Sequence, residues 1–172
     1  MKKVAVIGCG GSGKSYVARE LGTLLNAPVT HLDAVFYDRD WNELPKEEFE
    51  ARQRDLVAEP SWVIDGNYNS TLPVRLQACD TVVFLDLPTA TCLWGAVWRQ
   101  LRRGAGQHRV TGEFNRIHRG VIRYIRIYRT KMRPKVLRKI QEHALHAEVV
   151  TLTSRRQVRR WLTQVAHDQA RP

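Results

Sequence analysis

The chain has 172 residues, of which 43% are hydrophobic, so its length and composition fit one domain, residues 1–172, with a core of its own. Its net charge of +11 is uneven, because residues 1–98 carry 9 Lys+Arg and 13 Asp+Glu whereas residues 99–172 carry 19 and 4, and this basic half indicates an anionic partner: nucleotide phosphates, a nucleic acid or an anionic surface. The longest apolar stretch beyond the N-terminal segment, CLWGAVW at 92–98, is far shorter than the roughly 20 residues of a membrane helix, so we expect no membrane span.

Short apolar runs of β-forming residues alternate with helical segments along the whole chain. This pattern is typical of a parallel sheet with crossover helices, and continuous Val/Ile/Leu runs indicate strands that are covered on both faces. We therefore expect an α/β fold, a five-stranded parallel sheet with helices on both faces. The expected strands are 4–9, 28–33, 62–67, 81–87 and 148–154, and the expected helices are 14–25, 46–58, 71–79, 89–103, 115–143 and 154–166.

Three local signals refine these boundaries. Pro45 and Ser154 suit helix starts, Pro45 by its fixed φ and Ser154 by side-chain capping. The segment GAGQHRVTGE (104–113) combines three glycines with polar residues and is expected to be a loop. The tail after Ala166 is expected to fray.

The N-terminus and the cysteines indicate a cytoplasmic location. The opening MKKVAVIGCGG starts like a signal peptide, but its apolar run ends in glycines and Lys14 before a hydrophobic stretch of adequate length. Cys9, Cys79 and Cys92 form no CxxC pair and cannot all pair within one chain, which fits a reducing compartment.

The segment GCGGSGKS, from Gly8 to Ser15, matches the phosphate-loop pattern GxxxxGK[ST] between an expected strand and an expected helix. Its glycines let backbone N–H groups point inward, and the helix N-terminus adds positive potential for a polyphosphate. Lys14 is expected to reach the β- and γ-phosphates and Ser15 to bind Mg²⁺. The candidate nucleotide-binding residues of this loop are Gly8, Gly10, Gly11, Ser12, Gly13, Lys14 and Ser15.

Three carboxylates, Asp33, Asp65 and Asp86, stand at the ends of expected strands. The carboxyl ends of parallel strands converge on the ligand crevice of an open sheet, so these side chains are candidates for the metal and the substrate. For each one alone, a role in a turn or a helix cap is the alternative.

Several segments resemble a known family. WVIDGNY (62–68) and TVVFLDLP (81–88) resemble the Asp-Gly strand and the following strand of adenylate-kinase-like nucleotide kinases. More narrowly, HLDAVFYDRDW (31–41), DGNYNSTLPVRLQACDTVVFLDLP (65–88) and LTSRRQV (152–158) resemble bacterial DNA topology modulation proteins, P-loop members of the same group. The resemblance covers nearly the whole chain.

The resemblance implies that Asp65 helps to hold Mg²⁺ through water and that Asp33 faces the phosphoryl acceptor, with a general-base role that also makes chemical sense. Asn67 and Tyr68 stand where nucleoside monophosphate kinases have an aromatic residue, a proline and an arginine, which argues against a nucleoside monophosphate acceptor. Arg75 either replaces the missing positive charge or is an exposed helix residue.

The aromatic residues Phe36, Tyr37 and Trp41 either form an acceptor pocket by ring stacking or pack a loop against the core. The expected acceptor-binding residues are Asp33, Tyr37, Asn67, Tyr68 and Arg75.

Arg99, Arg102 and Arg103 precede the glycine-containing segment, where related kinases carry arginines that lead into a mobile lid; a short lid is expected at about 104–114. By resemblance, Arg99 lies near the adenine and Arg103 near the transferred phosphate, whose charge suits guanidinium groups.

The expected helix at 115–143 is amphipathic and strongly basic. One side carries Arg116, Arg119, Arg123, Arg126 and Arg133, the other side carries Ile117, Val121, Tyr124, Ile125 and Tyr128, and Arg129, Lys131 and Lys135 extend the basic patch. A solvated basic face is the alternative to a role in nucleotide or nucleic-acid binding.

The favoured function is therefore that of an ATP-dependent kinase that uses ATP and Mg²⁺ and acts on a nucleotide or another small-molecule acceptor. The alternative is a regulator in which nucleotide binding switches a nucleic-acid-binding surface, as the resemblance to topology modulation proteins implies. A GTPase switch is disfavoured because no NKxD guanine-reading motif occurs.

Overall fold

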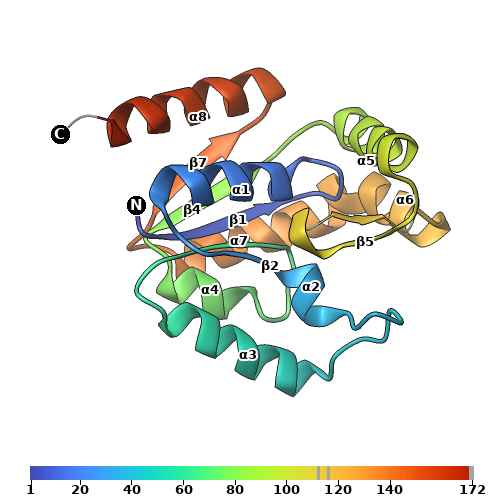
Figure 1. Ribbon diagram of the computed structural model, residues 1–172, viewed down its shortest axis with the longest axis horizontal. Coiled ribbons are helices and arrows are strands. Elements are labelled where there is room, and N and C mark those ends of the chain that lie inside the picture. Colours follow the sequence, from blue (N-terminus) through green and yellow to red (C-terminus); the bar gives the residue numbers. More distant parts are fainter. Residues whose placement is uncertain (112, 116, 171–172) are drawn as a thin grey trace.

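A five-stranded parallel sheet forms the centre of the molecule (Figure 1), and the computed structural model describes residues 1–111, 113–115 and 117–170. The strand order is β2-β3-β1-β4-β7, so β1 lies in the middle between β3 and β4. The strands are β1 (Lys3–Gly8), β2 (Val29–His31), β3 (Trp62–Asp65), β4 (Thr81–Leu85) and β7 (Glu148–Leu152). The predicted fold class is confirmed, and each strand of this sheet lies within or close to the range predicted for it.

Alternate residues of the inner strands enter two separate cores. Val4 and Val6 of β1 pack on one face, whereas Ala5 and Ile7 pack on the other. Helices α1 and α8 cover the first face and α3, α4 and α7 the second, while α5 and α6 lie at one end of the sheet (Figure 1). The helices are α1 (Lys14–Leu25), α2 (Leu32–Phe36), α3 (Lys46–Ala58), α4 (Leu72–Ala78), α5 (Thr89–Arg103), α6 (Arg119–Ile127), α7 (Arg133–His143) and α8 (Arg155–Gln169).

The second strand is shorter than predicted, and a helix follows it directly. β2 ends at His31, and α2 runs from Leu32 to Phe36 because buried Leu32 anchors the chain where it leaves the sheet. Asp33 is therefore in the first turn of α2, not at a strand end, so the prediction of a strand to residue 33 was wrong. The apolar run through this segment contained no signal that separated a strand from a short helix.

The predicted long helix at 115–143 is interrupted. α6 passes into a π-helical segment η2 (Tyr128–Met132), and α7 starts with Pro134 in its first turn. Proline has no amide hydrogen and cannot continue the regular hydrogen-bond ladder, which explains the change of helix type just before it.

The C-terminal elements differ from the prediction in two ways. β7 is an edge strand with exposed residues, so the expectation that every strand is covered on both faces was wrong for β7. α8 continues to Gln169, beyond the predicted end, while its predicted cap is confirmed: the Ser154 hydroxyl accepts a hydrogen bond from the Gln157 N–H.

The segment predicted as a loop contains regular structure. β5 (Gly106–His108) and β6 (Glu113–Asn115) form an antiparallel hairpin with a 3-10 turn η1 (Arg109–Thr111) between them. The Gln107 side-chain amide donates to the Asp38 carbonyl at 2.7 Å, and the Phe114 and Trp41 rings pack edge to face with their centroids 5.8 Å apart. The hairpin thus contacts the chain that follows α2. No helix in the described ranges has the length and apolarity that a bilayer crossing needs.

Candidate phosphate-transfer site

The phosphate loop joins β1 to α1 at the end of the sheet that faces α5. Gly11 and Gly13 have positive φ angles of 76° and 97°, which glycine adopts without strain and which turn the loop back on itself. A Cβ on Gly11 would lie 2.1 Å from the Cys92 carbonyl oxygen, so α5 packs directly on the loop. The Lys14 ammonium donates to the Cys9 carbonyl at 3.1 Å, so its charge stays at the loop.

Ser15 and Asp65 lie together beside this loop. The Ser15 hydroxyl donates to Asp65 Oδ2 at 2.8 Å, and Asp65 Oδ1 is 2.5 Å from Nδ1 of His31. Among the described residues, no group of three or more His, Cys, Asp and Glu side chains could hold a metal by itself. A hydroxyl beside one carboxylate fits a Mg²⁺ ion that arrives with a nucleotide, since Mg²⁺ in such sites takes most of its other ligands from phosphates and water.

Asp33 and Tyr68 form a second pair. The Tyr68 hydroxyl donates to Asp33 Oδ1 at 2.5 Å. Burial raises the pKa of Asp33 above its ordinary value, while the hydrogen bond from Tyr68 and the charges of Lys14 and Arg99 act in the opposite direction. Because Lys14 belongs to the phosphate loop, the charge of this loop acts on the Asp33 carboxyl.

Asp86 has a partner of its own. The guanidinium of Arg133 donates through Nε to both Asp86 oxygens at 2.9 Å and through a second nitrogen to Oδ2 at 2.7 Å, and Arg129 lies 3.8 Å away. A bidentate arginine satisfies most of the capacity of a carboxylate. Of the two candidates near the metal, the geometry favours Asp65, because Asp65 contacts the phosphate-loop serine and Asp86 contacts the basic helix.

Arg75 does not face a substrate. Its side chain is 0% exposed and donates to the Gly66 carbonyl at 2.6 Å and to the Asn67 carbonyl at 2.9 Å. Both predicted roles, acceptor binding and an exposed helix position, were therefore wrong, because the Arg75 side chain is fully buried. Its hydrogen bonds stabilise the backbone that follows β3. A buried guanidinium needs hydrogen-bond acceptors, and the turned backbone supplies them.

Asn67 connects two parts of the site. Its side-chain oxygen accepts a hydrogen bond from the Gly8 N–H at 3.0 Å, and its side-chain nitrogen donates to the Tyr124 hydroxyl at 2.8 Å. Asn67 therefore joins the start of the phosphate loop to α6. Its predicted contact with the acceptor stays a prediction.

The aromatic residues after Asp33 pack against one another. Phe36 contacts Phe49 and Tyr68 at 4.9 Å between ring centroids, which matches the packing alternative for this residue. The Tyr37 and Trp41 ring centroids lie 5.6 Å apart, and Trp41 in turn contacts Phe114 of the β5–β6 hairpin. Tyr37 stays a candidate acceptor contact at the border between α2 and the lid.

A cavity beside the phosphate loop contains two arginines. Its lining includes Lys14, Ser15, Trp98, Arg99 and Arg155. Arg99 lies where its charge also acts on Asp33, so its position fits the phosphates at least as well as the predicted adenine. Arg155 also lines this cavity and was not predicted as a site residue; in the sequence it is marked only by its place directly after Ser154.

Arg102 and Arg103, at the end of α5, are not among the residues that line this cavity. Arg103 donates to the Thr111 hydroxyl at 3.2 Å and so contacts the turn of the β5–β6 hairpin. The Arg102 guanidinium lies 5.8 Å from the centre of the Trp98 ring. The predicted role of Arg103 at the transferred phosphate stays a prediction.

The basic region has an exposed side and a side that faces the site. Arg119, Arg123 and Arg126 of α6 are exposed, whereas Ile125 and Tyr128 are buried in the core next to the phosphate loop. Arg116, predicted on the same side, lies outside the described residues. Nothing in this arrangement tests nucleic-acid binding, which stays a prediction.

No family model matches the chain, and no curated protein matches it in sequence. Solved structures do match. Shikimate kinase from Acinetobacter baumannii in complex with shikimate has 18% identity and a TM-score of 0.58 over 99% of this chain and 96% of that chain. Deoxyadenosine kinase from M. mycoides has 12% identity and a TM-score of 0.51 over 96% and 97% of the two chains, and shikimate kinase from Bacteroides thetaiotaomicron has 16% identity and a TM-score of 0.50 over 95% and 96%.

These likenesses, together with the strand order, define the class of fold: an α/β fold with a five-stranded parallel sheet, which shikimate kinase also has. The structures that share it span almost the same length as this chain.

Proposed function

We propose that the chain is an ATP-dependent kinase that transfers the γ-phosphate to a hydroxyl group of a small molecule. The observation that carries the proposal is the Asp33 carboxyl, which accepts a hydrogen bond from Tyr68 at 2.5 Å and lies close enough to Lys14 and Arg99 for their charges to act on it. The structures with the same fold include shikimate and deoxyadenosine kinases, which supports this reaction class.

In this proposal, the backbone N–H groups of Gly8–Ser15 and the Lys14 ammonium bind the β- and γ-phosphates. Ser15 and Asp65 would hold Mg²⁺, Asp65 through water, and the ion would neutralise charge on the phosphate oxygens. Arg99 acts from α5 on the same phosphates, and Arg155 closes the cavity from α8.

Asp33 accepts the proton of the attacking hydroxyl. The acceptor oxygen forms a bond to the γ-phosphorus, the bond from that phosphorus to the β-γ bridging oxygen of ATP breaks, and ADP leaves with that oxygen. Tyr68 holds the Asp33 carboxyl, and Tyr37 and Asn67 border the acceptor side. Arg103 and the hairpin at 104–114 would form a lid that limits access of water, which favours transfer over hydrolysis.

Three broader assignments belong to the same proposal. Residues 1–172 act as one P-loop domain of the adenylate-kinase-like group, related to topology modulation proteins through the segments that resemble them. The location is cytoplasmic, in keeping with the free thiols of Cys9, Cys79 and Cys92. The alternative function remains a nucleotide-switched regulator that binds nucleic acid through the exposed arginines.

The test is ³¹P NMR of the protein with ATP and Mg²⁺, first alone and then with pools of nucleosides, nucleoside monophosphates and hydroxyl metabolites. We expect ADP and a new phosphorus resonance only when an acceptor is present. Lys14→Ala should abolish transfer without unfolding the protein, whereas Lys46→Ala, at the exposed start of α3, should leave transfer unchanged. Asp33→Asn should reduce transfer far more than ATP affinity.

Two results would contradict the kinase. Unchanged transfer in Lys14→Ala would exclude the phosphate loop as the site. ATP that binds but is never transferred to any acceptor would favour the nucleotide-switched regulator.

A further inference from the structure

Both oxygens of the Asp65 carboxylate are engaged, and by residues of different elements. Oδ2 accepts from the Ser15 hydroxyl at the start of α1, and Oδ1 lies 2.5 Å from Nδ1 of His31 at the end of β2. His31 and Asp65 are register partners in neighbouring parallel strands, so the sheet itself brings their side chains together. Both are buried, with 7% and 4% of their surfaces exposed.

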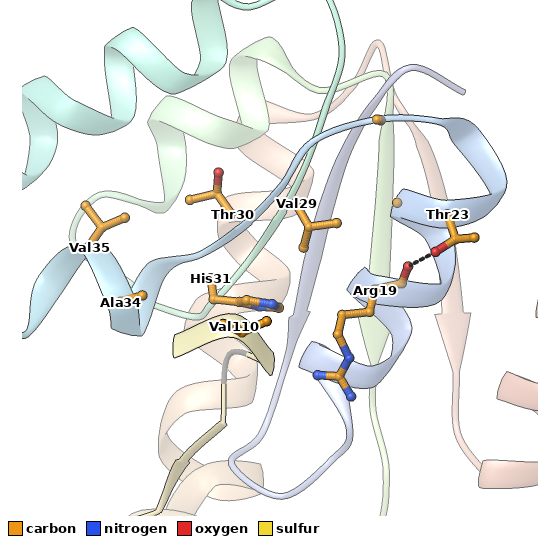
Figure 2. A pocket seen from close by; sticks show the side chains of 10 residues that line it. Arg19, Thr23, Val29, Thr30, His31, Ala34, Val35 and Val110 are labelled. Carbon is orange, nitrogen blue, oxygen red and sulfur yellow. Dashed lines mark hydrogen bonds between the residues drawn. The ribbon is translucent and has the colours of Figure 1, made fainter. Parts of the chain in front are cut away.

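The hydrogen bond has a defined direction. An ionised carboxylate can only accept, so Nδ1 of His31 carries the hydrogen and donates to Asp65. The rest of the imidazole ring borders a cavity of about 640 Å³ between α1, β2 and α2, lined also by Arg19, Val29 and Val110 (Figure 2).

We propose that His31 is a positioning residue that fixes the orientation of Asp65 toward the Mg²⁺–nucleotide complex. This inference rests on the proposed metal role of Ser15 and Asp65. With Oδ1 held by His31, Oδ2 is directed at the serine that binds the ion. Partners that orient a metal-binding group in this way strongly affect metal affinity, although they do not touch the metal.

A purely structural role for His31 is the competing explanation, because a buried hydrogen bond also contributes to stability. The two roles differ in what depends on the metal. A positioning role changes the affinity for the metal in the nucleotide complex and leaves metal-free nucleotide binding intact. A structural role changes thermal stability and affects both kinds of binding together.

The experiment uses three variants of the full chain. His31→Leu removes the donor, and His31→Asn restores an N–H at the same distance from the backbone as Nδ1. Gln53→Leu is the matched control, because Gln53 is likewise buried, with 0% of its surface exposed, and its side chain donates a hydrogen bond to Thr71 at 2.8 Å. It lies on α3, whose Phe49 packs in the second core.

The readouts are the affinity for Mn²⁺, used as a paramagnetic substitute for Mg²⁺, in the presence of ATP by electron paramagnetic resonance, and the affinity for ATP in EDTA by calorimetry. We expect His31→Leu to weaken Mn²⁺ binding by about 10-fold or more. Its affinity for ATP in EDTA should equal that of the wild type. His31→Asn should recover most of the Mn²⁺ affinity, and Gln53→Leu should lower thermal stability without a change in Mn²⁺ affinity.

Equal or tighter Mn²⁺ binding in His31→Leu, or no recovery in His31→Asn, would overturn the positioning role. Equal losses of Mn²⁺ and metal-free ATP binding would do the same and would assign His31 a structural role. If the wild type bound neither ATP nor Mn²⁺ with ATP, the proposed function would fail together with the inference. Because no readout needs an acceptor, an unidentified substrate does not affect the result.

Discussion

The surroundings of Asp33 change the pKa of its carboxyl group. Its carboxyl is desolvated, which raises its pKa, and the hydrogen bond from Tyr68 partly offsets this effect. A general base works best when its pKa approaches the working pH, so a raised aspartate pKa suits the removal of a proton from a hydroxyl. Tyr68 thus holds the Asp33 carboxyl in place and limits the rise of its pKa that burial causes.

This balance predicts the pH dependence of the reaction. Asp33 must be deprotonated to act, so kcat/KM should fall as the pH decreases through its pKa, and this acid limb should lie above the range of an ordinary aspartate. Tyr68→Phe removes a hydrogen bond that lowers the Asp33 pKa, so the limb should move to higher pH. A pH profile of kcat/KM for both proteins measures the shift, and a limb that stays in place or moves to lower pH contradicts the assignment.

The buried Arg75 is expected to contribute to the stability of the fold. Burial lowers the pKa of Arg75 to about 10, with the nearby Asp65 charge acting in the opposite direction, so the side chain is still charged at neutral pH. Arg75→Leu would leave the Gly66 and Asn67 carbonyls without these partners, and we expect the free energy of unfolding to fall by about 2–4 kcal/mol in urea titrations. Arg54→Leu, on the exposed side of α3, is the control and should change it by less than about 0.5 kcal/mol. Similar losses in both variants would argue against a special role for Arg75.

At the scale of elements, α5 packs against the phosphate loop without space for a side chain between the two backbones. A Cβ on Gly95 would lie 2.2 Å from the Gly11 carbonyl oxygen and 2.9 Å from the Arg155 guanidinium. The backbones of the two elements therefore touch, and only glycine allows this approach.

Gly95→Ala should consequently weaken ATP binding, even though alanine favours helix by about 1 kcal/mol over glycine. α5 would have to move away from the loop and take Arg99 with it. Calorimetric titration with ATP measures the loss, and Val97→Ala, at an exposed position of the same helix, should bind ATP as the wild type does. Wild-type affinity in Gly95→Ala would show that the close contact between α5 and the phosphate loop is not needed for ATP binding.

The sequence predicted the elements whose pattern is local. The strand, glycine turn and helix around Lys14 follow from their own residues, and the cap at Ser154 does so too. The short helix α2 was not predicted, because its apolar residues continue the pattern of β2. The break before α7 was also missed, although Pro134 marked it.

The parts of the site that sequence could not predict depend on contacts between distant segments. Nothing near Arg75 in the chain indicates that its charge is fully buried, and nothing near His31 indicates that Asp65 is its register partner. Arg155 reaches the phosphate loop only because α8 packs beside α1. These positions follow from the order of the strands, which the residue pattern does not determine.

At the scale of the molecule, positive charge follows the chain order. The half of the sequence that carries 19 Lys+Arg and 4 Asp+Glu contributes the β5–β6 hairpin, α6, α7, α8 and the edge strand β7, whereas the acidic half contributes β1 to β4. The excess of basic residues therefore lies on the elements that follow β4 and not on β1 to β4. Such a distribution raises the local concentration of anionic nucleotides.

This distribution predicts weak, salt-sensitive binding to nucleic acid. Affinity for duplex DNA should fall steeply as salt rises, because each phosphate contact releases counterions, while phosphate transfer should not require DNA. Fluorescence anisotropy over a range of salt, with parallel turnover assays, measures both. Tight binding that persists at high salt, or turnover that requires DNA, would instead favour the regulator.

The central place of β1 also bears on how the chain acquires its shape during synthesis. β1 is made before both of its neighbours, and it pairs with residues 62–65 of β3 and 81–85 of β4, so its edges stay open until those segments have left the ribosome. Such long-range pairing is slow. The phosphate loop therefore reaches its final geometry only late in folding, so a ligand that binds this loop would stabilise the folded chain and would not stabilise the incomplete one.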